Sequence, residues 1–281
     1  MFKRFKLLAL LMGFTVSAVA QPTQQAPLEI GIFPYLSTRA LLSTYQPLQQ
    51  FLEQKLNRKV NLVTAPDMRT FVARTQDNAY MYVVTAPHFA RLAQLDSSYR
   101  PLLRANRNLA GVLLVRKDSA IRNIEQLRGK TVVTPDSLAI ISLLGVELLK
   151  RNGLVASKDV IIQSLPTHNA AVVILQNGAV DAAVVSLTAF LQMTPEQRAG
   201  LTVIKQTAEV PHVMYLAGAK VNTADADAFV LLLRQFTEHT AEGKQFIESL
   251  GYQGLRAPTE QELRSLDPYL DMLKADLAKA R

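Results

Sequence analysis

Short apolar runs alternate with amphipathic segments along most of the chain. The runs are rich in β-branched residues and end at proline or at a polar residue, and the segments after them carry apolar residues at helical spacing. This alternation predicts an α/β fold built on mainly parallel, doubly wound sheets. The expected strands are Leu28–Phe33, Val60–Val63, Tyr80–Val84, Leu102–Ala105, Leu109–Arg116, Thr131–Thr134, Val160–Ser164, Asp181–Ser186 and Val203–Gln206.

Helix boundaries follow from capping residues and prolines. Ser37 or Thr38 caps a first helical piece, and Pro47 near a first turn predicts a second helix at Pro47–Leu56. The later expected helices are Met68–Arg74, His88–Leu95, Asn123–Leu127, Leu138–Gly153, His168–Gln176, Leu187–Met193, Ala224–Glu238, Gly243–Leu250 and Glu260–Ala280.

The strand–helix pattern restarts after Lys117, which predicts two lobes. We expect lobe 1 to comprise residues 28–116 and 212–281, and lobe 2 residues 117–211. The chain then crosses between the lobes twice, near Lys117 and near His212. Both lobes are expected to contain mixed sheets.

The N-terminus has the three parts of a secretory signal peptide. Lys3, Arg4 and Lys6 precede an apolar stretch of about ten residues, and Ala18-Val19-Ala20 is a small-residue cleavage site. The apolar stretch is shorter than the ~20 residues of a spanning helix, although an uncleaved anchor is the alternative. We therefore expect a signal peptide at 1–20, a polar tail at 21–27 and a periplasmic protein.

Composition excludes several classes of protein. The chain has no cysteine, which rules out disulfides, thiolate metal sites and a lipoprotein anchor. Its net charge is +8, and no run of basic residues is interleaved with aromatics, so we expect no nucleic-acid partner. The four histidines lack the spacing of a metal site, and no nucleophile-elbow, metalloprotease, P-loop or dinucleotide motif occurs. We expect no catalytic residue, metal or cofactor, and consider an enzyme the least favoured class.

One turn stands out as a place for anion chemistry. The strand Thr131–Thr134 leads through Pro135, Asp136 and Ser137 directly into a predicted helix. A helix N-terminus at this point offers free backbone N–H groups to an anion or a carbonyl group. Ser137 is therefore a candidate ligand donor, a helix cap, or both.

Other candidates lie at the carboxyl ends of predicted strands, where open α/β sheets bind ligands. Tyr35 follows the first strand, Thr85 and His88 follow the third, and His168 lies at a strand-to-helix turn. His212 lies in the return crossing. For each, a structural role is the alternative: a surface aromatic for Tyr35, a first-turn residue for His88, a capping or core side chain for His168, and a hinge marker for His212.

The order of several motifs resembles the phosphate/phosphite/phosphonate-binding family of periplasmic substrate-binding proteins of ABC transporters. The resemblance extends from about Leu28 to Tyr252 and implies a two-lobed fold that closes on a small ligand. It also implies that His168 is a ligand-binding residue, together with Asn169 of the same motif. The motifs are Ile30–Pro34, Tyr45–Leu48, Phe51–Glu53, Thr64–Asp67, Val115–Ser119, Gln126–Lys130, Thr167–Ala170 and Asn177–Ala182.

The chain departs from that family at ligand positions. Met68 and Leu109 stand where phosphonate binders have tyrosines, and the hydroxyl-rich turn of the family is replaced by Ser137-Leu138-Ala139-Ile140-Ile141. A dianionic phosphonate would lose several charge-assisted hydrogen bonds there. We therefore expect weak binding of phosphate and phosphonates.

We expect a monomer that binds a small anion or an organic acid between its lobes and delivers it to a membrane permease of the ABC type. The alternative is a sensory protein that presents its closed form to a membrane histidine kinase. Both functions need the same ligand-driven closure, so the sequence does not distinguish them.

Overall fold

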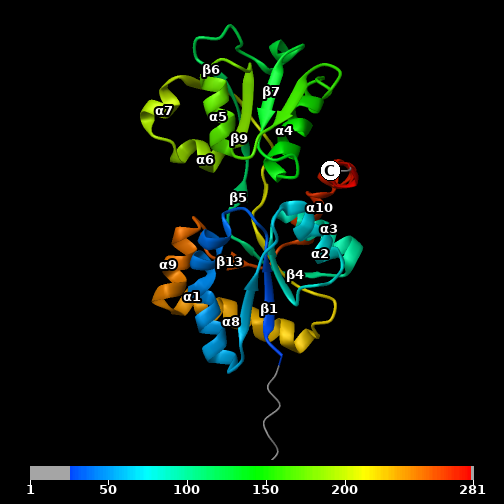
Figure 1. Cartoon of the computed structure of the whole chain (residues 1–281), viewed down its shortest axis with the longest axis vertical. Helices are drawn as coiled ribbons and strands as arrows, with labels where there is room; N and C mark the ends of the chain where they lie inside the picture. The colour runs from blue at the N-terminus through cyan, green and yellow to red at the C-terminus, as the bar shows by residue number, and fades with distance from the viewer. Residues whose placement is uncertain (1–25, 280–281) are drawn as a thin grey trace, which may run out of the picture.

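The chain is described here by a computed structural model, which covers residues 26–279. The signal peptide and most of the polar tail expected from the sequence lie outside the described residues. Two α/β lobes stack along the long axis of the molecule and are joined by a narrow waist (Figure 1). Within the described part of the chain, no helix has the length and apolar character needed to span a membrane.

Lobe 1 is built on a six-stranded mixed sheet in the order β13-β4-β12-β3-β1-β2. Strand β1 runs parallel to β2 and β3, while β12 runs antiparallel to β3 and β4. The strands are β1 (Leu28–Ile32), β2 (Val60–Val63), β3 (Tyr82–Thr85), β4 (Arg100–Ala105), β12 (Met214–Ala217) and β13 (Leu255–Arg256). Its helical elements are α1 (Thr38–Leu56), α2 (Met68–Gln76), α3 (Pro87–Ser97), α8 (Thr223–His239), α9 (Ala241–Ser249), α10 (Glu260–Arg264), η2 (Asp267–Tyr269) and α11 (Leu270–Ala278).

Lobe 2 contains a five-stranded sheet in the order β10-β6-β9-β7-β8. The three strands β9, β7 and β8 are parallel, and β6 joins them to β10 through antiparallel pairing. The strands are β6 (Gly111–Arg116), β7 (Thr131–Thr134), β8 (Ile161–Ser164), β9 (Ala182–Ser186) and β10 (Leu201–Gln206). The helical elements are η1 (Ile124–Leu127), α4 (Ile140–Arg151), α5 (His168–Gln176), α6 (Leu187–Gln192) and α7 (Pro195–Ala199).

The waist is a ladder of two short strands. β5 (Asn108–Leu109) pairs antiparallel with β11 (Val210–Pro211), so both crossings of the chain run side by side. The second crossing thus lies beside His212. The first lies at residues 106–110, not near Lys117, because Gly111–Arg116 belongs to the sheet of lobe 2. The sequence missed this boundary because an apolar strand has the same pattern in either lobe.

Three predicted helices also differ from the structure. The single helix expected at Glu260–Ala280 is divided, within the described residues, into α10, η2 and α11. Pro47 lies inside the single helix α1, whose buried face repeats at helical spacing through Leu41, Tyr45, Leu48 and Leu52. That continuous apolar face offsets the missing N–H of one proline. Helix α4 begins at Ile140, two residues later than expected, because an intervening turn occupies the preceding residues.

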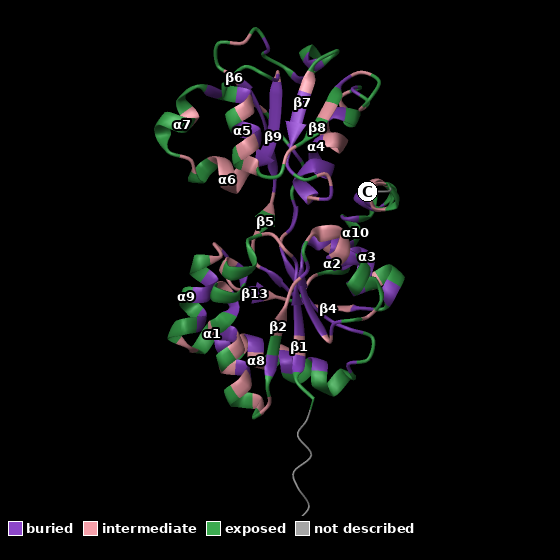
Figure 2. Ribbon diagram, viewed as in Figure 1, coloured by how far each residue is buried: buried purple, intermediate pink, exposed green. Residues whose placement is uncertain are grey.

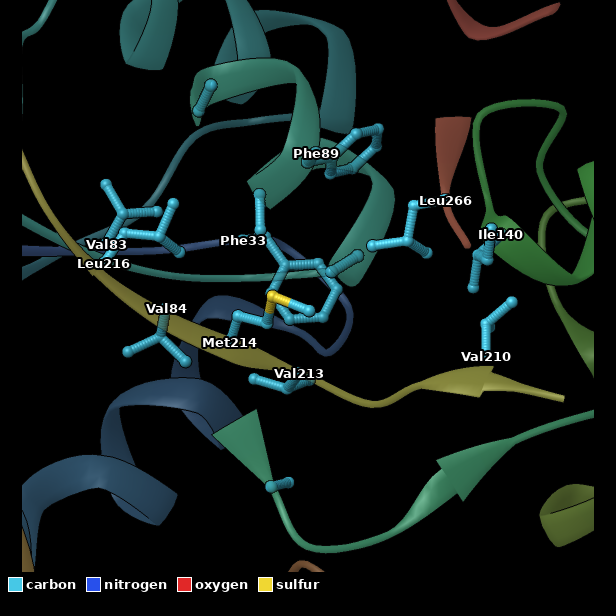
Figure 3. Close-up of a cluster of buried hydrophobic side chains, with 14 of the residues drawn as sticks. Phe33, Val83, Val84, Phe89, Ile140, Val210, Val213, Met214, Leu216 and Leu266 are labelled. Atoms are coloured by element: carbon cyan, nitrogen blue, oxygen red, sulfur yellow. The ribbon is translucent and has the colours of Figure 1, made fainter. Parts of the chain in front are cut away.

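Most strands of both sheets are buried, and the helices present exposed outer faces (Figure 2). The main hydrophobic core is continuous from one lobe to the other. Figure 3 shows Ile140 of lobe 2 in the same cluster as Phe89 and Leu266 of lobe 1. Apolar contact therefore joins the lobes on one side of the waist.

A network of charged side chains fixes the base of the waist. The buried guanidinium of Arg104 donates from Nη1 to Glu262 Oε1 at 2.6 Å and from Nη2 to Asn108 Oδ1 at 2.9 Å. Arg107 donates to the carbonyl oxygen of Gly251 in lobe 1 at 2.8 Å and to Thr188 Oγ1 in lobe 2 at 3.1 Å. Arg107 therefore links the two lobes beside the ladder.

Candidate functional site

A cavity of about 470 Å³ lies between the two lobes and receives residues from both. A second hollow, of about 530 Å³, lies on lobe 1 between α1 and β2 and is lined without any titratable side chain. The interlobe cavity collects three histidines and two aspartates, so it is the candidate site. Its lining is Phe33, Pro34, Tyr35, Pro66, Asp67, Met68, Ala86, Pro87, His88, Phe89, Leu109, Pro135, Asp136, Ala139, Ile140, Ile141, Pro166, Thr167, His168, Ser186, His212 and Val213.

Four helices of at least nine residues begin at this cavity, two from each lobe, and the six-residue α6 also begins there, with Ser186 as its N-cap. Residues of the N-terminal turn or cap of α2, α3, α4 and α5 all belong to the lining. Each of these helices follows a strand, and the strand ends bring the helix starts to the facing edges of the two sheets. The first N–H groups of each helix and its dipole favour negative charge at its start.

The starts of α2, α3, α4 and α5 differ in whether a carboxylate of the protein already compensates the positive end of the helix dipole. Asp67 caps α2 by accepting from the N–H of Thr70 at 2.7 Å. Asp136 accepts from the N–H of Leu138 at 2.8 Å in the turn before α4. The caps of α3 and α5 carry no charge, because they are Ala86 and Thr167. The positive potential of the cavity is thus least compensated at α3 and α5.

His168 is the first residue of α5, where the capping hydroxyl of Thr167 accepts from the N–H of Ala170. Its Nδ1 accepts a hydrogen bond from the backbone N–H of Ser186 at 3.3 Å. A ring nitrogen that accepts carries no proton, so in the neutral ring the proton is on Nε2. Burial lowers the pKa of His168, which favours this neutral form. His168 therefore offers one N–H donor.

His88 is fully buried at the start of α3 and bridges the lobes. Its Nε2 lies 2.8 Å from the carbonyl oxygen of Leu138 in lobe 2. A carbonyl only accepts, so Nε2 donates and Nδ1 carries a lone pair. Burial lowers the pKa of His88 to about 4, against the smaller raising effect of the Leu138 bond. The neutral ring of His88 thus fastens lobe 1 to the turn before α4.

His212 lies just after β11, at the waist. Its Nδ1 accepts from the N–H of Val213 at 2.8 Å, which leaves the ring proton on Nε2. Burial and, to a smaller extent, the charges of Arg107 and Arg104 together lower the pKa of His212 to about 4. Its ring packs edge-on against Tyr252, with centroids 5.1 Å apart. His212 is therefore a second neutral N–H donor on the cavity wall.

The structure brings together part of the predicted set. The predicted residues that line the cavity are Tyr35, His88, His168 and His212. Those that do not line it are Thr85, Ser137 and Asn169.

Each exclusion has a structural reason. Thr85 is 1% exposed within the core, and Asn169 is exposed in the first turn of α5. Ser137 caps nothing, because Asp136 closes the turn and α4 starts after Ala139.

Sequence reasoning missed both carboxylates of the cavity. Asp67 is part of the motif Thr64–Asp67, and its position before an apolar helical segment is a capping signal that identifies it in retrospect. Asp136 directly precedes Ser137, which the sequence analysis selected as the candidate donor or cap. Of the positions at which the chain departs from the family, Leu109 and Ile141 lie on the wall, whereas Leu138 does not.

No lysine or arginine is among the lining residues, all of which lie within residues 26–279. Within that same range, no group of three histidine, aspartate or glutamate side chains is placed to hold a metal ion. The donors of the cavity are thus backbone N–H groups and neutral imidazoles, set among apolar side chains. Such a site suits a small ligand of low charge.

The fold and the interlobe cavity define a two-lobed binding protein of the periplasmic type. A family model described as ABC transporter, phosphonate, periplasmic substrate-binding protein matches residues 30–263. The chain belongs to this family, as the motif order indicated.

Solved structures of similar fold come from several binding proteins. XAC2383 from Xanthomonas citri bound to ATP has a TM-score of 0.79 at 18% identity, over 91% of this chain and 100% of that chain. PhnD1 from Prochlorococcus marinus in complex with methylphosphonate has a TM-score of 0.74 at 14% identity, over 88% of this chain and 98% of that chain. At these identities the likeness is one of fold.

A curated relative comes from a different functional class. The tetrathionate sensor histidine kinase TtrS of Salmonella typhimurium is 30% identical over 182 residues. The match covers 59% of this chain and 30% of the kinase, so the chain spans less than a third of that relative's length.

Proposed function

We propose that the protein binds a small, singly charged anion or an organic acid in the interlobe cavity and delivers it to an ABC-type permease. The observation that carries this proposal is the meeting of the N-termini of four longer helices, α2, α3, α4 and α5, at a cavity without a lysine or arginine on its wall. The helix starts favour negative charge, while Asp67 and Asp136 limit how much of it the site stabilises.

The donors suggest where the charged end of the ligand lies. The α5 start and the Nε2–H of His168 are close together in lobe 2, and His212 offers its Nε2–H from the waist. The apolar side chains of Phe33, Phe89 and Ile140 suit the remainder of a ligand. A dianionic phosphonate or phosphate, which gains most from several hydroxyl and cationic donors, is expected to bind weakly.

The proposal also includes the membrane protein to which the ligand-bound form binds. Family membership supports delivery to a permease. The match to a sensor histidine kinase supports a second candidate, in which the closed form signals to a kinase. Neighbouring genes distinguish the two: a permease and ATPase pair supports transport, whereas a kinase and response regulator support sensing.

A ligand screen tests the proposal directly. Purified protein is heated with acetate, glycolate, methanesulfonate, tetrathionate, methylphosphonate and inorganic phosphate, and hits are titrated by calorimetry. We expect the melting temperature to rise with a singly charged or organic acid and to change little with phosphate or methylphosphonate, because only bound ligand stabilises the fold. Micromolar binding of methylphosphonate contradicts the charge argument. A hit that leaves the radius of gyration unchanged in solution scattering contradicts binding between closing lobes.

A further inference from the structure

Three tyrosine hydroxyls gather in lobe 1 behind the cavity wall. Tyr35 follows β1, Tyr45 belongs to α1 and Tyr215 to β12. Each hydroxyl is buried, and within residues 26–279 none has a partner at full hydrogen-bond geometry. The Tyr45 hydroxyl nevertheless interacts with those of both Tyr35 and Tyr215, so the three form a row with Tyr45 in the middle.

The row has one O–H proton more than it has contacts between its hydroxyls. Each phenol has one O–H proton, and two contacts between three hydroxyls use two of them. Burial raises the pKa of all three tyrosines, so each keeps its proton at neutral pH. Tyr252, which interacts electrostatically with Tyr35 and Tyr215, is another protonated phenol. As a fourth member of an open row it would add one proton and one acceptor, so one proton is still left over. One donor of the row is therefore left over, and a buried donor without an acceptor is costly.

Of the three tyrosines, only Tyr35 is placed to donate the remaining proton to a ligand. Tyr215 and Tyr45 are 1% and 0% exposed, and neither lines the cavity. Tyr35 is half-buried and belongs to the cavity wall, with its ring stacked on Phe33 at 4.7 Å between centroids. An acceptor that enters the cavity thus meets the row at Tyr35, in a lining that also includes His212.

We propose that these hydroxyls form a donor relay, from Tyr215 through Tyr45 to Tyr35, which presents one O–H to a hydrogen-bond acceptor of the bound ligand. Tyr35 is then a specificity-determining residue, and Tyr45 and Tyr215 are positioning residues that set the direction of its proton. The relay selects ligands with an unprotonated oxygen at the lobe 1 end, such as a carboxylate or sulfonate. This inference rests on the proposed binding of a ligand in the interlobe cavity.

The test removes single hydroxyls and keeps each ring. Wild type, Tyr35→Phe, Tyr45→Phe and Tyr215→Phe are titrated with acetate, methanesulfonate, tetrathionate and methylphosphonate, with the tyrosine near-ultraviolet difference spectrum as a second readout. Tyr80→Phe is the matched control. The Tyr80 hydroxyl is also buried without a hydrogen bond of good geometry, but Tyr80 does not line the cavity.

We expect Tyr35→Phe to weaken the best probe roughly tenfold, and Tyr45→Phe and Tyr215→Phe about threefold each. The melting temperatures of these variants without a probe should stay equal or rise, because an unsatisfied hydroxyl has been removed. Tyr80→Phe should leave the affinity unchanged, and the tyrosine difference spectrum should be lost in Tyr35→Phe.

Three outcomes overturn the relay. If a probe binds all four variants as it binds wild type, the relay is wrong and the proposed function stands. If affinity and ligand-free melting temperature fall together in Tyr45→Phe and Tyr215→Phe, these hydroxyls only support the fold. If no probe binds wild type or changes its tyrosine spectrum, both the relay and the proposed function fail.

Discussion

The turns before α4 and α5 in lobe 2 both contain a proline but have different surroundings. Both follow parallel, neighbouring strands, β7 and β8, and both place a helix start at the cavity. The turn before α4 carries a carboxylate, Asp136, and gives the carbonyl of Leu138 to His88 of the other lobe. The turn before α5 has the neutral cap Thr167, with His168 facing the cavity.

This difference indicates that the two turns of lobe 2 have different roles, one in contact with lobe 1 and one in ligand binding. The α4 turn is occupied by contact with lobe 1, since Ile140 joins the cluster of Phe89 and Leu266 in Figure 3. The α5 turn has no such contact to lobe 1 among its hydrogen bonds within residues 26–279, so its donors face the cavity. We infer that one helix start holds the lobes together and the other is available for the ligand.

The largest effect is expected for Ile140→Asp, which tests whether the α4 turn holds the two lobes together. The variant places a carboxylate at a position that is 5% exposed between the lobes, and burying an unpaired charge costs about 3 kcal/mol or more. We expect the lobes to separate, seen as a larger radius of gyration in solution scattering without ligand. Ile161→Asp on the exposed edge strand β8 is the control, since Ile161 is 54% exposed. Equal scattering for both variants contradicts an interlobe role for Ile140.

Two alanine variants test which of the two turns binds the ligand. His168→Ala removes the Nε2–H donor of the α5 turn and should weaken an anionic ligand by about 1–3 kcal/mol, as measured by calorimetry. Ser137→Ala, in the α4 turn, should change the affinity by less than about 0.5 kcal/mol, because Ser137 is not on the cavity wall. The opposite order of effects would mean that the α4 turn binds the ligand.

A smaller effect is expected on the pH dependence of the free energy of unfolding. The pKa of His88 is lowered to about 4 in the folded protein, below the ordinary value of 6.5. A lowered histidine pKa stabilises the fold above pH 6.5, and that stability is lost as the pH falls toward 4. Denaturant unfolding at about pH 7 and about pH 5.5 should differ by about 1 kcal/mol from this group.

His88→Gln isolates that contribution. A glutamine amide donates to the carbonyl of Leu138 without titrating, so the pH dependence of unfolding should become shallower than in wild type. His212 titrates in the same direction and remains in both proteins, which makes the difference between them the informative quantity. Identical pH slopes would show that His88 is not held neutral by the fold.

The sequence predicted best what depends on neighbouring residues. The strand–helix alternation and the strand-to-helix turn at His168 are local signals, and they gave the two-lobed fold and a wall residue of the cavity. The α4 start was misplaced by two residues because Asp136 and Ser137 are both good capping residues, and only the folded turn shows that Asp136 closes it.

Long-range contacts were beyond the reach of sequence patterns. His88 and Leu138 are 50 residues apart, and nothing local to either predicts a hydrogen bond between the lobes. The row of tyrosines combines residues from the start, the first helix and the late strand β12 of lobe 1. The first crossing of the chain was missed for the same reason, since the choice of sheet for Gly111–Arg116 is made by tertiary pairing.

The position of β12 in the sheet of lobe 1 constrains the order in which the protein folds during synthesis and export. Every strand of lobe 2 lies within residues 111–206, so that sheet is complete once this segment has emerged. In lobe 1, β12 (Met214–Ala217) separates β3 from β4, so this sheet lacks an interior strand until lobe 2 has followed it out. Until then β3 and β4 have unpaired edges, which are the kind of surface that aggregates or recruits chaperones.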